Sequence, residues 1–430
     1  MTGGYATAAD LPNTKGPPPP PPSWWSTVTV NGEIDAGITG NFDDPSSGLN
    51  WGHLFTDKAN EPMFNQGLLT IQRPIDSSKP AYDVGFAFQV MYGSDSRFVH
   101  YLGECEYCIN SLYQVSLVEA YVQAHTPWVF PGGIDFKVGQ WPTLEGAEVV
   151  ESDLNLFYSH SYIFNYTEPF QDTGLLAIAH VNPTVDLYGS IVTGENTSIG
   201  FPYGDNNTAP SFEGGIGLNN LGPGGAVTVL ATTHIGPEDP YYGGGVEPSG
   251  AGQVPVAYSG CGGCSGNTAL RYANDLVVTW KATDKLTLTL EGNYTRDDGF
   301  ADETYGAAGY ASYQTPLDWL KINGRAEVLR DDTGGIVAAF PGYFDFVNVE
   351  HGYLNTSIVA PPTTYFEITG GLNITPPIPT SIPFLKAVIF RPEVRYDTSL
   401  NGTAPYDLQY NGVGLKTSEV TVGGDVILKF

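Results

Sequence analysis

Two groups of charged residues have types and spacing that could act on a passing solute. The acidic group lies close together in the chain, at Glu145, Glu148, Glu151 and Asp153. The basic group lies on polar sides of alternating segments, at Lys321, Arg325, Arg391 and Arg395. Acid and base facing each other across a water-filled passage would set up a transverse field that favours small polar solutes. In the competing interpretation, the basic residues pair locally with Glu327, Glu393 and Asp397.

Cysteines form a second candidate site. They fall in two CxxC pairs, Cys105 with Cys108 and Cys261 with Cys264. Two such pairs could bind zinc, but in an oxidising compartment we favour disulfides, closed within each pair or between the pairs. Haem attachment is excluded, because Ile109 and Ser265 stand where it requires histidine. We expect no metal and no cofactor.

A catalytic interpretation has little support. Ser159, His160 and Ser161 place hydroxyl groups beside a base. Adjacent residues of an extended chain point to opposite faces, so they cannot form a nucleophile and base pair directly. We therefore expect a protein that is not an enzyme and has no catalytic residues.

Composition narrows the class of protein. The chain has 18 Lys and Arg against 46 Asp and Glu, a net charge of -28, which argues against nucleic acid as a partner. Only 15% of residues are charged while 13% are aromatic, which suits a wall facing lipid with aromatic girdles at its two interfaces. No apolar run approaches the roughly 18 to 20 residues of a membrane helix. A membrane form would therefore have to be a closed β-barrel.

The elements that would position the charged residues are strands. Apolar and polar residues alternate along many segments, as in a barrel whose polar face lines water and whose apolar face meets lipid, or in a soluble sandwich. We predict about sixteen strands, with boundaries uncertain by about two to four residues. They lie near 27–39, 66–74, 82–94, 114–126, 134–142, 170–181, 184–194, 211–220, 225–236, 270–282, 285–297, 304–315, 319–330, 364–375, 386–398 and 419–430.

The connections decide between barrel and sandwich. Tight turns alternate with long loops, and only the loop near 298–303 breaks the pattern. Short turns at one end and long loops at the other are typical of outer-membrane barrels. We predict an all-β fold, a transmembrane antiparallel up-and-down barrel with both termini in the periplasm.

The ends of the chain add three predictions. Ala6-Thr7-Ala8 has the form of a signal-peptidase site, so residues 1–8 would be the remaining end of a signal peptide. The proline-rich stretch over 9–26 would be a periplasmic tail, and 27–430 would form the barrel. The last strand ends on an aromatic residue, Phe430, which we expect to act as an assembly signal and to face lipid where this strand pairs with the first.

Residues 136–176 carry a family resemblance. A strand with Gly139-Gln140 leads into an acidic stretch, Asn155, the segment Tyr158-Ser-His-Ser-Tyr162, then Pro169-Phe170 and Thr173-Gly174. This order resembles the OmpL-like β-barrel porin-2 family of outer-membrane proteins. The resemblance implies a porin-like channel in the bacterial outer membrane and brings no specific substrate.

We therefore expect passive diffusion of small hydrophilic solutes and ions, with a mild preference for cations. By analogy with general porins, the loop near 143–169 would fold into the lumen and narrow it. The alternatives are a solute-selective channel and a plugged structural or adhesive surface barrel. Expected partners are outer-membrane lipid, lipopolysaccharide and the barrel assembly machinery, and a homotrimer is an option borrowed from sixteen-stranded porins.

Overall fold

The computed structural model describes residues 23–78, 80–104, 112–243, 254–339 and 360–430. Cys105, Cys108, the signal-peptide end and most of the proline-rich tail therefore lie outside the described residues. Within the described part, no helix is long and apolar enough to cross a membrane.

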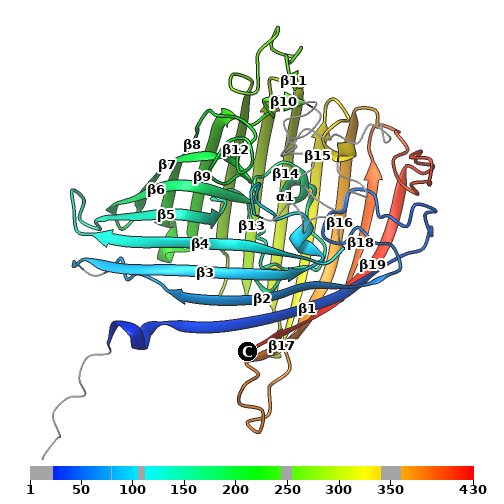
Figure 1. Cartoon of the computed structure of the whole chain (residues 1–430). Helices are drawn as coiled ribbons and strands as arrows, with labels where there is room; N and C mark the ends of the chain where they lie inside the picture. The colour runs from blue at the N-terminus through cyan, green and yellow to red at the C-terminus, as the bar shows by residue number, and fades with distance from the viewer. Residues whose placement is uncertain (1–22, 79, 105–111, 244–253, 340–359) are drawn as a thin grey trace, which may run out of the picture.

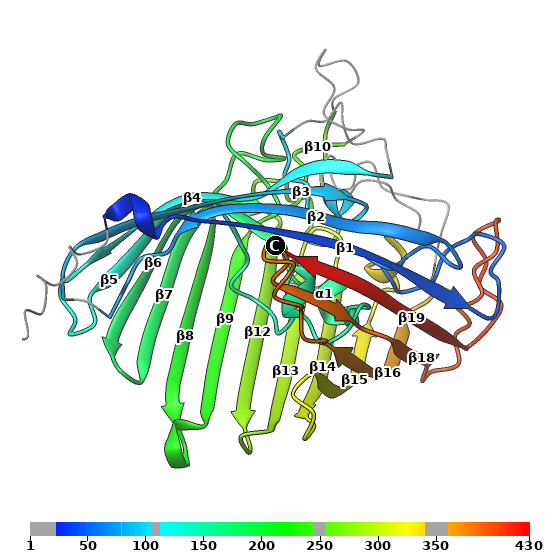
Figure 2. The same ribbon diagram turned by 90° about the horizontal axis from the view of Figure 1, so that it is seen from below.

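One antiparallel sheet closes on itself, because β1 pairs with both β2 and β19. Figures 1 and 2 show its strands wrapping around a common interior. The strands of the sheet are β1 Thr29–Asn41, β2 Pro62–Arg73, β3 Asp83–Gly93, β4 Gln114–Thr126, β5 Ile134–Pro142, β6 Gln171–Asn182, β7 Val185–Glu195, β8 Ser211–Leu221, β9 Val227–Pro237, β12 Leu270–Lys281, β13 Leu286–Asp297, β14 Asp302–Gln314, β15 Leu320–Asp331, β16 Thr363–Ile374, β17 Ala387–Phe390, β18 Glu393–Ser399 and β19 Ser418–Lys429.

Two of these strands are halves of one. β17 and β18 both lie between β16 and β19 and are separated by Arg391-Pro392. Pro392 has no amide hydrogen and cannot donate to the ladder, so the strand is interrupted there. Counted as one, they make the sheet a sixteen-stranded barrel, which confirms the predicted strand number.

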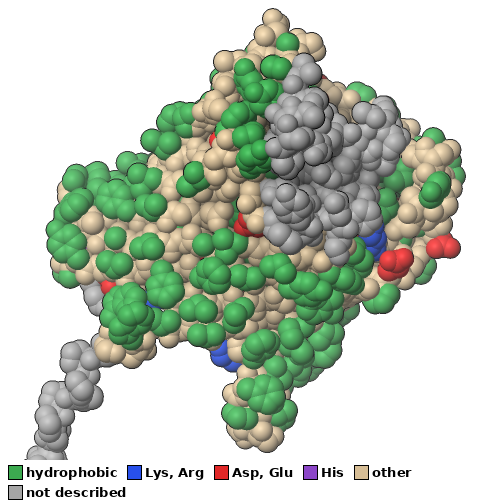
Figure 3. Space-filling view, viewed as in Figure 1, with side chains coloured by type: hydrophobic (Ala, Val, Ile, Leu, Met, Phe, Trp, Pro, Cys, Tyr) green, Lys and Arg blue, Asp and Glu red, His purple; other side chains and the backbone are tan. Residues whose placement is uncertain are grey.

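Alternating side chains give the barrel two different faces. Along β18 and β19 the inward residues are buried, while outward residues such as Val394, Val420 and Val422 are about half exposed. Figure 3 shows hydrophobic side chains spread over the outer surface with few charged groups among them. This outer face is suited to lipid.

Loops differ in length between the two ends of the barrel. Short connections join β2 to β3, β4 to β5, β6 to β7 and β8 to β9, whereas long segments follow β1, β3, β5, β9, β15 and β18. The long segments carry the small elements of the chain. These are η2 Asp95–Arg97, η4 Ser152–Leu154, α1 Tyr162–Tyr166, the hairpin of β10 Tyr242–Gly243 and β11 Val254–Pro255, and η6 Val337–Ala339.

An aromatic band marks the end with short connections. η1 (Trp24–Thr27) precedes β1, and η5 (Pro223–Gly225) forms the turn before β9. Exposed aromatic side chains occur in or beside these connections, at Trp24, Trp25, Tyr82, Trp128, Trp280 and Trp319. Amphipathic aromatic rings gathered at one end of a barrel are typical of a membrane–water interface.

The seam between β1 and β19 ends at Phe430. Its backbone N–H donates to the carbonyl of Gly32 at 2.9 Å, and the N–H of Gly32 donates back at 2.8 Å. The aromatic ring covers Gly32, since a Cβ at that glycine would lie only 2.1 Å from the ring. Phe430 therefore completes the closing strand pair on the outer face, where 42% of it is exposed.

Candidate pore-lining site

Residues 143–170, called here the inner segment, connect β5 to β6 and run through the barrel interior. Its short helix α1 lies inside the ring of strands in both ribbon views (Figures 1 and 2). Tyr162 stacks on Tyr365 of β16, and Phe164 packs against Phe55 and Phe170. Most of this segment is irregular backbone, whose polar groups need partners when buried.

Carboxylates of the barrel wall accept the N–H groups of the inner segment. Glu327 on β15 accepts from the N–H groups of Tyr162 and Ile163 at 2.6 and 2.7 Å. Glu393 on β18 accepts from Tyr158 at 2.9 Å. On the other side, Glu291 accepts from Ala147 at 2.7 Å and Asp275 from Gly146 at 3.3 Å.

Arginines of the wall donate to carbonyl groups of the same segment. Arg325 donates to the carbonyl of Ser159 at 2.8 Å, and Arg395 donates to that of His160 at 2.6 Å. Arg391 donates to the carbonyls of Ser152 and Asn155 at 2.6 and 3.0 Å. The charged wall thus holds both kinds of backbone group in an element with little structure of its own.

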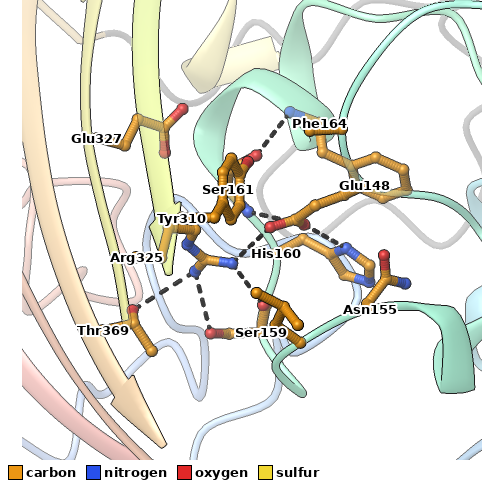
Figure 4. Close-up of polar contacts among 12 residues, drawn as sticks. Glu148, Asn155, Ser159, His160, Ser161, Phe164, Tyr310, Arg325, Glu327 and Thr369 are labelled. Atoms are coloured by element: carbon orange, nitrogen blue, oxygen red, sulfur yellow. Dashed lines mark hydrogen bonds and ion pairs between the residues drawn. The ribbon is translucent and has the colours of Figure 1, made fainter. Parts of the chain in front are cut away.

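Glu148 is the centre of the contact between segment and wall (Figure 4). It accepts from Arg325 at 2.7 Å, from Nδ1 of His160 at 2.7 Å and from the N–H of Ser161 at 3.1 Å. Burial alone would raise the pKa of Glu148, but the charge of Arg325 and the hydrogen bond from His160 outweigh it and lower the pKa to about 2. Glu148 is therefore a carboxylate at neutral pH.

The expected separation of acid and base across an open lumen is wrong for Glu148 and Arg325, which are in direct contact. The inner segment crosses the interior and brings its carboxylate to the basic wall, so the opposite charges neutralise each other. The other two arginines also have carboxylate partners, Asp397 for Arg395 and Asp425 for Arg391. The pair of Arg395 with Asp397 matches the alternative of local pairing on one strand.

The remaining members of the predicted charged set lie apart from this contact. Glu145 is buried, and neither of its carboxylate oxygens has a hydrogen-bond partner. Glu151 accepts from Gln89 at 3.2 Å, and Asp153 pairs with Lys429 at the end of β19. Lys321 is exposed at the start of β15.

Of the cysteines, only one pair lies in the described residues. Cys261 and Cys264 have Cα atoms 5.6 Å apart and are joined as a disulfide in the long loop before β12. The role of all four cysteines in the mature protein stays a prediction.

The wall facing the inner segment has a different character. Its inward side chains near the short-turn end are small and polar, and Thr279, Thr287 and Thr289 remain partly exposed. A cavity of about 190 Å³ lies between part of the segment and β13 and β14. It is lined by Ala147, Glu148, Leu154, Asn155, Leu156, Thr287, Thr289, Tyr310 and Ser312. Water can therefore reach this side of the interior.

Sequence reasoning did not predict that carboxylates of the wall hold the inner segment, and it named Glu327 and Glu393 only as local partners of the basic residues. Asp275, Glu291, Glu327 and Glu393 occupy inward positions of alternating strands. The alternation assigns them a face, but it does not show that irregular backbone will meet them there. The sequence signal for these carboxylates was that the inward face carries more acidic residues than its few arginines can neutralise.

Two glutamates of the inner segment should respond to pH in opposite directions. Burial, with the charges of Glu291 and Asp275 and the hydrogen bond with Glu291, raises the pKa of Glu168 well above its ordinary value. The folded state then holds a proton that the unfolded chain releases, so stability falls as pH rises above about 4.5. The lowered pKa of Glu148 stabilises the fold at pH values above about 4.5, and this contribution is lost as pH falls through about 2.

We expect Glu168→Gln to raise the midpoint of thermal unfolding by about 2 to 4 °C at pH 7.5. The gain should shrink toward zero at pH 4.5, whereas the matched variant Glu148→Gln should lower the midpoint at both pH values. Tryptophan fluorescence during heating in detergent micelles measures both. Equal effects of Glu168→Gln at the two pH values would contradict the assignment.

Together, the closed barrel, its apolar outer face and its polar interior with an inward segment define a porin-type channel of the bacterial outer membrane. A family model described as "Putative beta-barrel porin-2, OmpL-like" matches residues 27–430. The chain belongs to this family, as its residues had indicated. Family and fold point to a channel and not to an enzyme.

Solved structures support the same fold. The outer membrane channel DcaP of Acinetobacter baumannii is 11% identical with a TM-score of 0.53, over 94% of this chain and 97% of that one. OmpF of Salmonella typhi, solved in complex with daunomycin, is 10% identical with a TM-score of 0.50, over 94% and 97%. At these identities the likeness extends to the fold alone. A search of curated proteins finds no match.

Proposed function

We propose that the protein is a passive diffusion channel in which the inner segment forms the constriction. The observation that carries the proposal is the asymmetric packing of this segment. Arg325, Arg391 and Arg395 are at most 2% exposed beneath it. The facing residues Thr279, Thr287 and Thr289 are partly exposed. Solutes would pass along the threonine-lined side of the lumen.

The polarity of this path favours small hydrophilic solutes in general and does not select one chemical class among them. Its side chains are mostly hydroxyl and amide groups, which replace part of a solute's hydration without demanding a particular charge. On β4 to β7, the inward carboxylates that stay partly exposed are Glu119, Asp135 and Asp186. The partly exposed inward basic groups there are Lys137 and His180, and His180 contacts both Asp135 and Asp186. With the three arginines neutralised by carboxylates, this balance supports a mild cation preference.

The plugged barrel is the second candidate, and one observation favours it. Residues near Phe55, Phe98 and Phe164 form an apolar cluster inside the barrel, with the segments after β1 and β3 contributing to it. Such a cluster fills a part of the lumen that would be open in a wide pore. A periplasmic position of both termini, the homotrimer and contacts with lipopolysaccharide and the assembly machinery stay predictions.

Liposome swelling with solutes of graded size tests the proposal. We expect swelling rates that fall smoothly with size and agree between sugars and amino acids of equal size. One solute entering about tenfold faster than others of its size would favour the selective channel. Absence of swelling with any solute would favour the plugged barrel.

A further inference from the structure

A cluster of unpartnered ligand atoms lies on the wall of β6, β8 and β9, away from the arginines that hold the inner segment. It joins Asp172, Glu213 and His234, whose nearest ligand atoms all lie within 4.8 Å of one another. Asp172 and His234 are fully buried and Glu213 is 7% exposed. Asp172 follows directly on the return of the inner segment to the sheet at Gln171.

The histidine of this cluster has a fixed orientation. Its Nε2 lies 2.8 Å from a carboxylate oxygen of Glu238, just after β9. Glu238 also accepts hydrogen bonds from the N–H of Glu195 at 2.6 Å and from the hydroxyl of Ser211. In the tautomer that donates from Nε2–H to this carboxylate, the lone pair of Nδ1 is available for a ligand.

The free atoms of the cluster are all electron-pair donors. Nδ1 of His234, both oxygens of Asp172 and one oxygen of Glu213 are buried and have no hydrogen-bond partner. Nδ1 lies 3.9 Å from Asp172, too far for a hydrogen bond even if it carried a proton. Within the described residues, no ion pair joins a lysine or arginine to either carboxylate. Unpaired buried carboxylates are strongly unfavourable, so a bound cation would stabilise the cluster.

We propose that Asp172, Glu213 and His234 bind one divalent transition-metal ion of the zinc type. Two carboxylates balance its charge, and an imidazole nitrogen favours such a metal over calcium or magnesium, which prefer oxygen ligands alone. Glu238 is a positioning residue that orients the imidazole. The ion links three strands where the inner segment rejoins the sheet, and so fixes that end of the segment.

Metal uptake by the full-length protein in detergent tests the site. After treatment with a chelator and its removal, we expect about one equivalent of Zn²⁺ by elemental analysis, with Co²⁺ giving a visible spectrum. His234→Gln and Glu213→Gln should abolish uptake. Glu238→Gln should keep the stoichiometry and weaken affinity about 10- to 100-fold. Absence of stoichiometric uptake by the unaltered protein would overturn the proposal.

A matched control and a second measurement guard against misfolding of the variants. His53→Gln alters another buried histidine with two acidic neighbours, Asp397 and Glu419, and should leave uptake unchanged. X-ray absorption of zinc in the unaltered protein should show nitrogen and oxygen ligands at about 2.0 to 2.2 Å. Sulfur ligands, or loss of uptake only in His53→Gln, would place the metal elsewhere and refute the site.

Discussion

Replacing both Arg325 and Arg391 by alanine should raise the single-channel conductance about twofold or more and increase the preference for cations. Arg325 holds Glu148 and the carbonyl of Ser159, and Arg391 holds two carbonyl groups near η4. Their loss leaves Glu148 buried without its cation, which is strongly unfavourable and drives the inner segment away from the wall. Two positive charges also leave the lumen.

Matched variants separate charge from anchoring. Arg330→Ala removes an arginine from β15, the strand that carries Arg325. Arg330 pairs with Asp332 and donates a hydrogen bond to Thr364, so conductance should stay unchanged. Lysine at positions 325 and 391 keeps the charge but loses the forked hydrogen bonds, so it should raise conductance and leave selectivity as it is. Unchanged conductance and selectivity in the double alanine variant would show that these residues do not hold a constriction.

Deleting Phe430 should reduce the amount of folded barrel in the outer membrane by about tenfold or more, a larger effect than any on conductance. The deletion removes two backbone hydrogen bonds at the end of the β1–β19 seam and uncovers Gly32. An unsatisfied strand end is costly in lipid, and the seam is the last strand pair needed for closure.

The readout is heat-modifiable mobility of membrane extracts, paired with refolding of the purified chain into detergent. Slower refolding in detergent would show that Phe430 acts through the seam itself, because no assembly machinery is present there. Phe430→Leu keeps an apolar cover on Gly32 and should retain more folded protein than the deletion. Normal insertion of the deletion variant would remove the assembly role of Phe430.

The sequence specified the barrel better than it specified the interior. Strand alternation has a period of two and is local, so the sixteen strands could be predicted with small boundary errors. The break at Arg391-Pro392 was missed, although proline in a central strand is itself a warning. For Arg325, Arg391 and Arg395 the inward face could be predicted, and the local alternative named Asp397, which pairs with Arg395. Their contacts with the inner segment could not be predicted.

The interaction partners of the inward charged residues depend on the path of the irregular inner segment. The contact of Glu148 with Arg325 joins residues 177 positions apart, and no periodic pattern records such a distance. The same reason hid the cluster of Asp172, Glu213 and His234, whose members lie on three different strands. Both arrangements depend on the strand register and on the path of the loops. The local sequence pattern encodes the register but not the loop path.

Planar-bilayer recording of the purified protein tests directly whether the barrel is an open channel. Under a salt gradient, we expect discrete conductance steps and a reversal potential of the sign that indicates a mild cation preference. Properly folded barrels that give no conductance steps would contradict the channel and favour the plugged barrel. Steps with a clear anion preference would contradict the proposed charge balance of the lumen.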